Sequence, residues 1–241
     1  MNKKAYRVSF GLRLRRAILR SIARFLFHIL GRVKVTGLEN IPRGTSYVVA
    51  ANHVSIYDPP LILCFWPEML EAIGAVDVFD KPIQGELLKL YETIPVHRGE
   101  YDRELIEKML AILRSGHRLM IAPEGGRSHV TAMRRAKPGI GYILDEARVP
   151  VVPIGIVGAT DDFLKNGLKG KRPPLEMRVG KPIMLPPIEG RGEERRAARQ
   201  RNADLVMQHI AGLLPPEYRG VYADSSIEPN QAWSREVTVK P

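Results

Sequence analysis

Short apolar runs alternate along this chain with segments of helical periodicity, and this alternation limits what the chain can fold into. Residues 47–51, 119–123 and 149–157 are rich in aliphatic and β-branched side chains, which indicates buried strands. Residues 103–114 and 138–148 carry apolar side chains at helical spacing, and each segment precedes one of those strands. The pattern predicts a single α/β domain in which helices cover a central sheet, mostly parallel or mixed.

A histidine and an aspartate lie five positions apart directly after the first expected strand. His53 follows that strand and Asp58 precedes Pro59, so the pair brackets a strand-to-helix turn in which Asp58 is expected to cap the helix. Open α/β sheets bind ligands at the C-terminal ends of their strands. Because neutral imidazole accepts a proton near neutral pH when a carboxylate holds its other ring nitrogen, we predict a catalytic pair. The alternative is a helix cap beside an ordinary loop histidine.

The second expected strand ends in a sequence typical of an anion-binding loop. Glu124, Gly125, Gly126 and Arg127 follow it at once. Two glycines let backbone N–H groups approach an anion closely, and a guanidinium beside them binds phosphate oxygens in a bidentate way. We expect an oxyanion or phosphate cradle here. The alternative is a plain turn held by an ion pair between Glu124 and Arg127.

Four ordered blocks of the sequence resemble those of the glycerolipid acyltransferases, whose best-known members acylate 1-acylglycerol-3-phosphate. The first, Asn-His-x-Ser-x-x-Asp, occupies residues 52–58, and the third, Pro-Glu-Gly-x-Arg-Ser, occupies residues 123–128. The second block corresponds to residues 92–98, and the fourth, Val-Pro-Val-Val-Pro, to residues 149–153. Each block alone has little specificity, whereas the ordered set, which extends from about residue 33 to about residue 185, is specific.

The resemblance implies an enzyme that moves a fatty acyl group from acyl-CoA or acyl-acyl-carrier-protein to the hydroxyl of a lysophospholipid. The expected acceptor is 1-acylglycerol-3-phosphate and the expected product is phosphatidic acid, with no cofactor and no metal. The resemblance assigns His53 as the general base and Asp58 as the residue that orients it. It also assigns a substrate-binding set for the acceptor phosphate: Arg98, Glu124, Gly125, Gly126 and Arg127.

The chain departs from the family pattern at three positions. Gly126 replaces the usual threonine of the third block, and Glu92 and His97 replace the glycine and aspartate of the second. These blocks bear on substrate choice, so another acceptor, either glycerol 3-phosphate or an amino-lipid, stays open. Two other classes stay open as well: a lipid ester hydrolase that uses Ser55, and a non-catalytic lipid-binding protein.

The net charge of +11 predicts an acidic partner. An anionic membrane surface and an acidic carrier protein both fit, and nucleic acid is disfavoured because the sequence carries no signature of a nucleic-acid-binding fold. The single cysteine, Cys64, lies in an apolar run. This position favours a buried structural thiol over a nucleophile that handles the thioester.

Residues 12–30 have the periodicity of an amphipathic helix. One face carries the apolar side chains Leu14, Ile18, Ile22, Phe25, Leu26 and Ile29, and the opposite face carries Arg13, Arg16, Arg20 and Arg24. Such a helix can lie in a membrane interface, with its apolar side among acyl chains and its cations at anionic headgroups. Charges interrupt it too often for a transmembrane span or a secretory signal. We expect a peripheral protein at the cytoplasmic face of a membrane, with packing of this helix on the domain core as the alternative.

Three segments follow from these patterns. Residues 1–32 are expected to form the membrane-interface helix, residues 33–216 the acyltransferase domain, and residues 217–241 a polar C-terminal tail. The chain of 241 residues is long enough for one well-buried core. Within the domain, a later strand is expected at residues 175–179 and a final helix at residues 193–214.

Overall fold

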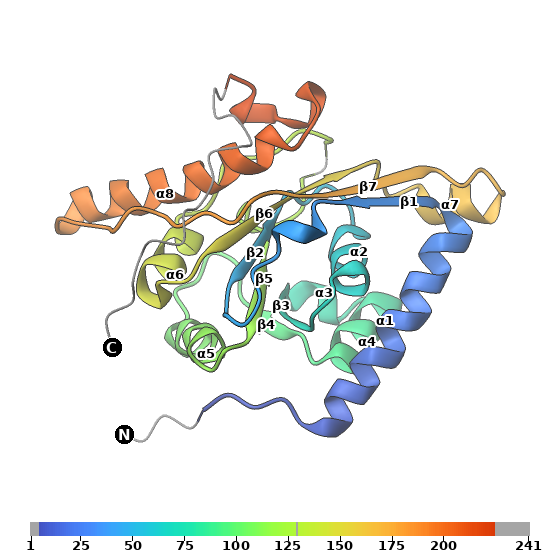
Figure 1. The fold of residues 1–241 in the computed structure, drawn as a ribbon, viewed down its shortest axis with the longest axis horizontal. Helices are drawn as coiled ribbons and strands as arrows, with labels where there is room; N and C mark the ends of the chain where they lie inside the picture. The colour runs from blue at the N-terminus through green and yellow to red at the C-terminus, as the bar shows by residue number, and fades with distance from the viewer. Residues whose placement is uncertain (1–4, 129, 225–241) are drawn as a thin grey trace.

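A mixed sheet of seven strands forms the centre of the protein, which a computed structural model describes for residues 5–128 and 130–224 (Figure 1). Across the sheet the order is β1-β7-β6-β2-β5-β3-β4, and every neighbouring pair is parallel except β6 and β7. The strands are β1 (Arg32–Thr36), β2 (Val48–Ala51), β3 (Leu70–Ala75), β4 (Ile94–Val96), β5 (Arg118–Ile121), β6 (Val151–Val157) and β7 (Pro174–Val179). The expected α/β fold with a mixed sheet is confirmed.

Helices cover both faces of this sheet (Figure 1). They are α1 (Phe10–Leu30), α2 (Asp58–Phe65), α3 (Val76–Phe79), α4 (Pro82–Tyr91), α5 (Arg103–Arg114), α6 (Gly139–Ala147), α7 (Phe163–Leu168) and α8 (Gly192–Gly212). Short 3-10 turns occur at Leu38–Asn40, Pro216–Tyr218 and Gly220–Tyr222. Helices α5, α6 and α8 pack on one face, and α1, α2 and α7 pack on the other.

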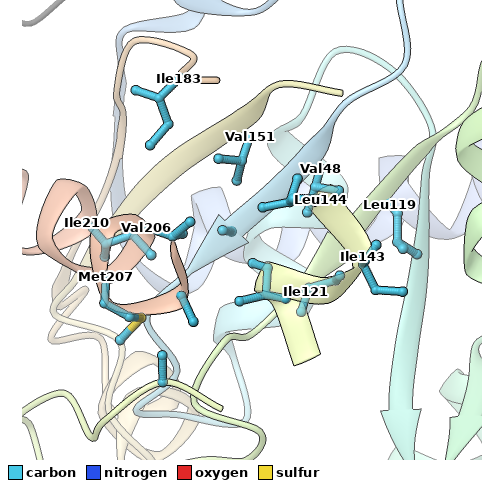
Figure 2. Close-up of a cluster of buried hydrophobic side chains, with 14 of the residues drawn as sticks. Val48, Leu119, Ile121, Ile143, Leu144, Val151, Ile183, Val206, Met207 and Ile210 are labelled. Atoms are coloured by element: carbon cyan, nitrogen blue, oxygen red, sulfur yellow. The ribbon is translucent and has the colours of Figure 1, made fainter. Parts of the chain in front are cut away.

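Alternation along the central strand β2 divides the apolar interior into two layers. Val48 and Ala50 belong to the cluster beneath α5, α6 and α8, whereas Val49 and Ala51 belong to the cluster beneath α1, α2 and α7. Figure 2 shows the first cluster, in which side chains from the sheet meet Ile143, Leu144, Val206, Met207 and Ile210 from α6 and α8. Because β2 is buried on both faces, nearly every residue of the strand must be apolar.

Helix α1 packs on the domain through three of the four arginines of its basic face, which corrects the expectation that those three cations lie at lipid headgroups. Arg16 is fully buried and forms a bidentate ion pair with Glu71 of β3, with N···O distances of 2.7 and 2.8 Å. Arg20 and Arg24 donate to main-chain carbonyls at the C-terminal end of α2. Those carbonyls lack partners within their own helix and carry its negative dipole, so guanidinium groups satisfy them well.

The apolar face of α1 consequently points away from the protein. Its members, Phe10, Leu14, Ile18, Ile22, Phe25, Leu26 and Ile29, are between 47% and 78% exposed. Neighbouring helices add exposed apolar side chains, namely Ile83, Leu87 and Leu90 of α4 and Leu164 and Leu168 of α7. We call these twelve residues the apolar surface. Among the described residues, no helix has the length and hydropathy needed to cross a bilayer.

The beginning of the expected C-terminal tail packs on the domain. Tyr218 and Tyr222 are buried, and the hydroxyl of Tyr222 accepts a hydrogen bond from the Ala136 N–H (2.9 Å) and donates one to Asp204 (2.7 Å). The Tyr218 hydroxyl accepts from the N–H of Gly158, 3.0 Å away, just beyond β6. The rest of the expected tail, residues 225–241, lies outside the described residues.

Candidate active site

The parallel pairing of β2 with β5 brings the two polar sequence blocks to one edge of the sheet. Ala50 lies opposite Ile121, so the residues that follow each strand emerge side by side. On the other side of β2, the side-chain amide of Asn52 pairs with the backbone of Ile156, which donates at 2.8 Å and accepts at 3.0 Å. This pair extends the ladder by one step, so His53 begins where regular pairing ends.

The carboxylate of Asp58 holds the His53 ring from within the same turn. His53 Nδ1 lies 3.0 Å from Asp58 Oδ2, and the same oxygen accepts the backbone N–H groups of Val54 and Ser55, each at 2.7 Å. Asp58 is the first residue of α2, and its side chain turns back toward the preceding loop. The predicted helix cap by Asp58 is therefore wrong, whereas Pro59 does lie in the first turn as predicted.

Burial and hydrogen bonding act in opposite directions on this aspartate. Only 1% of Asp58 is exposed, and burial raises the pKa of its carboxyl group, while hydrogen bonds from His53, Ser55 and Val54 oppose the rise. The His53 side chain is 17% exposed. When Nδ1 carries the proton that faces Asp58, Nε2 is the acceptor nitrogen, and it has no hydrogen-bond partner among the described residues. Such a ring can take a proton from a substrate.

Glu124 ties the second loop directly to the backbone of His53. Its Oε1 accepts the His53 N–H at 2.9 Å, and its Oε2 accepts the Arg134 N–H at 2.8 Å. The Ser128 N–H donates in turn to the His53 carbonyl at 2.8 Å. Glu124 is buried, which raises its carboxyl pKa, and the hydrogen bonds from Arg134 and His53 oppose that rise. Both oxygens of this expected phosphate-binding residue are therefore used in joining loops.

The two glycines lie close to basic side chains. Gly125 has φ +69°, and a Cβ there would come within 2.9 Å of the Lys137 side chain. A Cβ on Gly126 would lie 3.3 Å from a terminal nitrogen of Arg134 and 3.4 Å from Nε of Arg98. Arg98, which follows β4, therefore lies beside the glycine loop.

Arg127 pairs with an aspartate that the sequence gave no reason to select. Its Nη1 lies 2.6 and 2.8 Å from the two carboxylate oxygens of Asp161, in the loop between β6 and α7. The alternative ion pair between Glu124 and Arg127 is not formed, because Glu124 binds backbone groups instead. Sequence reasoning also missed Arg134, whose only signal was a basic stretch ten positions after Glu124.

Two candidate nucleophiles are turned away from this chemistry. The hydroxyl of Ser55 is buried, donates to Asp161 (3.3 Å) and accepts from the Tyr57 N–H (3.3 Å). Cys64 is buried in α2, where burial raises the pKa of its thiol to about 12. A thiol with that pKa stays protonated near neutral pH and is a poor nucleophile.

The sequence profile described as Acyltransferase matches residues 32–157, slightly more than half of the chain. The chain belongs to the acyltransferase family. It is 27% identical over 164 residues to a 1-acyl-sn-glycerol-3-phosphate acyltransferase of Cocos nucifera, covering 66% of this chain and 53% of that protein. It is also 27% identical over 179 residues to the human 1-acyl-sn-glycerol-3-phosphate acyltransferase alpha, covering 73% and 62%. The chain thus spans about half the length of the plant relatives.

A solved acyltransferase has the same fold. The structure of the 1-acyl-sn-glycerophosphate (LPA) acyltransferase PlsC from Thermotoga maritima superimposes with a TM-score of 0.55 at 24% sequence identity. The match covers 83% of this chain and 82% of that one. The two chains therefore share their overall fold.

This acyltransferase chain departs from its family at the turn before β4, for a visible reason. Glu92 ends α4 in the left-handed region with φ +54°, which glycine adopts without a steric penalty. Here the Glu92 side chain pairs with Arg15 of α1. Arg98 follows β4 two residues after its end.

Proposed function

We propose that this chain transfers a fatty acyl group from a thioester to the hydroxyl of a lysophospholipid, with 1-acylglycerol-3-phosphate as acceptor and phosphatidic acid as product. One observation carries the proposal: the His53–Asp58 pair is joined through its own backbone to the loop that holds Arg127. A proton acceptor and an anion-binding group are thereby fixed relative to each other, as transfer to a phosphorylated alcohol requires.

The mechanism is direct attack by the acceptor. His53 Nε2 takes the hydroxyl proton as the oxygen forms a bond to the thioester carbonyl carbon. The tetrahedral intermediate then loses its C–S bond, and the departing thiolate takes the proton from the imidazolium. Asp58 keeps Nδ1 protonated and stabilises the imidazolium charge, as the acidic member of a serine-type triad does. No acyl-enzyme forms.

Arg127 and Arg98 are the proposed phosphate ligands, on either side of Gly125 and Gly126. A guanidinium binds phosphate through two parallel N–H···O bonds. We assign Glu124 a supporting role, because its contacts are with the N–H groups of His53 and Arg134. Arg134 joins the basic set, since it donates to the Gly126 carbonyl at 2.6 Å.

The rival classes have less support. A hydrolase would need Ser55 next to the His53 ring, but this hydroxyl is buried and bonded to Asp161 and Tyr57. Simple lipid binding does not require a histidine held by a buried carboxylate. The donor is either acyl-CoA or acyl-acyl-carrier-protein, and the net charge of +11 favours approach of either anionic molecule.

We propose that residues 1–32, together with the parts of the apolar surface on α4 and α7, attach the protein peripherally to the cytoplasmic face of a membrane. Apolar burial is the main attraction in this arrangement, because Arg16 is paired internally and Arg20 and Arg24 cap α2. A bilayer-resident acceptor would then meet the enzyme at the surface in which it is dissolved.

The decisive experiment replaces the catalytic pair. In purified His53→Ala, transfer from one labelled acyl thioester should fall by about 10²–10⁴-fold, because general-base catalysis is lost, and Asp58→Asn should also be impaired. A panel of lysophosphatidate, glycerol 3-phosphate, a phosphodiester lysolipid and an amino-lipid identifies the acceptor. Acyl-CoA and acyl-acyl-carrier-protein are both tested as donors with each acceptor.

The matched control is His117→Ala, at the opposite end of β5 from the catalytic edge. Circular dichroism establishes that each variant is folded. Turnover by folded His53→Ala at the wild-type rate would exclude the mechanism. Release of free fatty acid without an acceptor would favour the hydrolase.

A further inference from the structure

Asp161 pairs with Arg127, whose guanidinium group is one of the two proposed ligands of the acceptor phosphate. Both of its carboxylate oxygens contact Nη1 of Arg127, at 2.6 and 2.8 Å. The remaining contacts of Asp161 are longer: it accepts from the Ser55 hydroxyl at 3.3 Å and from the Ile56 N–H at 3.5 Å. An anion thus already lies between Arg127 and the turn that carries His53.

The exposures of the two side chains indicate which of them can move. The Asp161 side chain is 59% exposed, whereas that of Arg127 is 23% exposed. Asp161 belongs to an irregular loop, and Arg127 belongs to the loop fixed to His53 by Ser128 and Glu124. An ion pair with one largely solvated partner is weak, because water and salt compete for the charge. The carboxylate can therefore leave Arg127 at low cost.

We infer that Asp161 is a displaceable counter-ion that sets the affinity of the site for phosphate; this inference rests on the proposed function. Through its contacts with Arg127, Ser55 and Ile56, the carboxylate holds Arg127 beside the catalytic turn. A phosphomonoester carries a charge of about −1.5 to −2 at pH 7 and three acceptor oxygens, so it displaces a carboxylate of charge −1. After transfer, return of Asp161 to Arg127 promotes release of the phosphorylated product.

Removal of a competing counter-ion and removal of a residue that only positions Arg127 change KM and kcat in different directions. A counter-ion that competes with phosphate raises KM, so its removal should strengthen the binding of phosphate and slow product release. A residue that only positions Arg127 would, when removed, weaken binding or lower kcat for every acceptor. A lower KM therefore indicates a counter-ion, and a higher KM or a lower kcat indicates a positioning residue.

The test compares Asp161→Asn with Asp162→Asn in the full-length protein. Asparagine at position 161 keeps an oxygen that accepts from Ser55 and Ile56 but removes the charge. Asp162 is the matched control, because the same change in net charge occurs one residue away, where the side chain forms an exposed ion pair with Lys165 at 4.0 Å. Asp161→Glu keeps the charge and should lower the KM for a phosphorylated acceptor less than Asp161→Asn does.

For Asp161→Asn we expect the KM for lysophosphatidate, and the Kd for glycerol 3-phosphate measured by calorimetry, to fall about two- to five-fold, the range of an exposed ion pair. Inhibition by phosphatidate should strengthen likewise. In an Arg127→Ala background, Asp161→Asn should change neither the KM nor the Kd.

A higher KM, a lower kcat on all acceptors, an unchanged Kd or an equal effect in Asp162→Asn would each overturn the inference. Glycerol 3-phosphate binding tests it even if the chain transfers no acyl group, an outcome that would contradict only the proposed function.

Discussion

At Arg127, the shape of the cation matters as well as its charge. Arg127→Lys keeps the charge but removes the bidentate fork, so we expect kcat/KM for a phosphorylated acceptor to fall about 5- to 30-fold, equivalent to about 1–2 kcal/mol. An acceptor without the phosphate should lose much less. Initial rates with both acceptors provide the measurement. Arg135→Lys, on an exposed arginine paired with Asp204, is the control, and equal losses with the two acceptors would indicate a structural role for Arg127.

Some residues of the site can be predicted from a short sequence pattern, and others cannot. His53 and Asp58 are five positions apart, and Gly125 and Arg127 are two positions apart, so a local pattern suffices to select them. Asp161 lies in the loop after β6, 34 positions from Arg127, and nothing near it in sequence predicts their contact. The cap expected from Asp58 fails for a similar reason. Its carboxylate has three donors in the preceding turn, and these together outweigh one helix N–H.

At the scale of elements, periodicity located the expected helices and strands but not the surfaces against which they pack. The strands and helices foreseen from the sequence agree with the observed ones to within two residues at each end. Strands β1, β3 and β4 were not foreseen; in β3, Glu71 interrupts the apolar residues. The sequence also left open whether α1 turns its arginine face toward lipid or toward the domain. Its two faces are plain from the sequence, but only the fold supplies the buried carboxylate that draws Arg16 inward.

The ion pair between Arg16 and Glu71 is the central contact of α1, and we expect Glu71→Gln to destabilise the protein by about 3–5 kcal/mol. Both partners are buried, so removing one charge leaves the other without compensation in a medium of low dielectric. Urea unfolding followed by circular dichroism gives the free energy.

Arg15→Ala provides a matched comparison on the same helix. Arg15 pairs with Glu92 at the surface, with both side chains at least 41% exposed. Its loss should cost less than about 1 kcal/mol. Similar losses for the two variants would mean that the Arg16 pair is weak and that α1 is held by other contacts.

At the scale of the whole molecule, the apolar surface and the catalytic turn lie on the same side of the sheet. Tyr57, which immediately precedes Asp58, packs edge-on against Phe163 of α7, with ring centroids 5.3 Å apart. Phe163 in turn contacts Phe27 of α1 at 5.4 Å. A chain of aromatic contacts therefore connects the turn that holds His53 to the helix whose outer face is apolar. The arrangement suits an enzyme that takes its acceptor from the surface to which it binds.

Membrane attachment through this surface should depend on apolar side chains and only weakly on salt. Replacing Leu14, Ile22 and Phe25 together by serine should lower the partition coefficient onto anionic vesicles roughly a hundred-fold, if each side chain contributes about 1 kcal/mol on partial burial. The fold should survive, because all three are more than half exposed in the free protein. Sedimentation with vesicles at low and high salt measures both effects.

The control for a general loss of apolar area replaces three other residues by serine. These are Leu38, Val130 and Val221, which are also exposed but lie outside the apolar surface. This variant should bind vesicles as the wild-type protein does. High salt should leave much of the wild-type binding intact, because Arg16 is buried and two further arginines of α1 bind carbonyl groups within the protein. Complete release by salt, or undiminished binding of the triple serine variant, would show that charges elsewhere on the molecule hold it to the bilayer and that the outer face of α1 has another role.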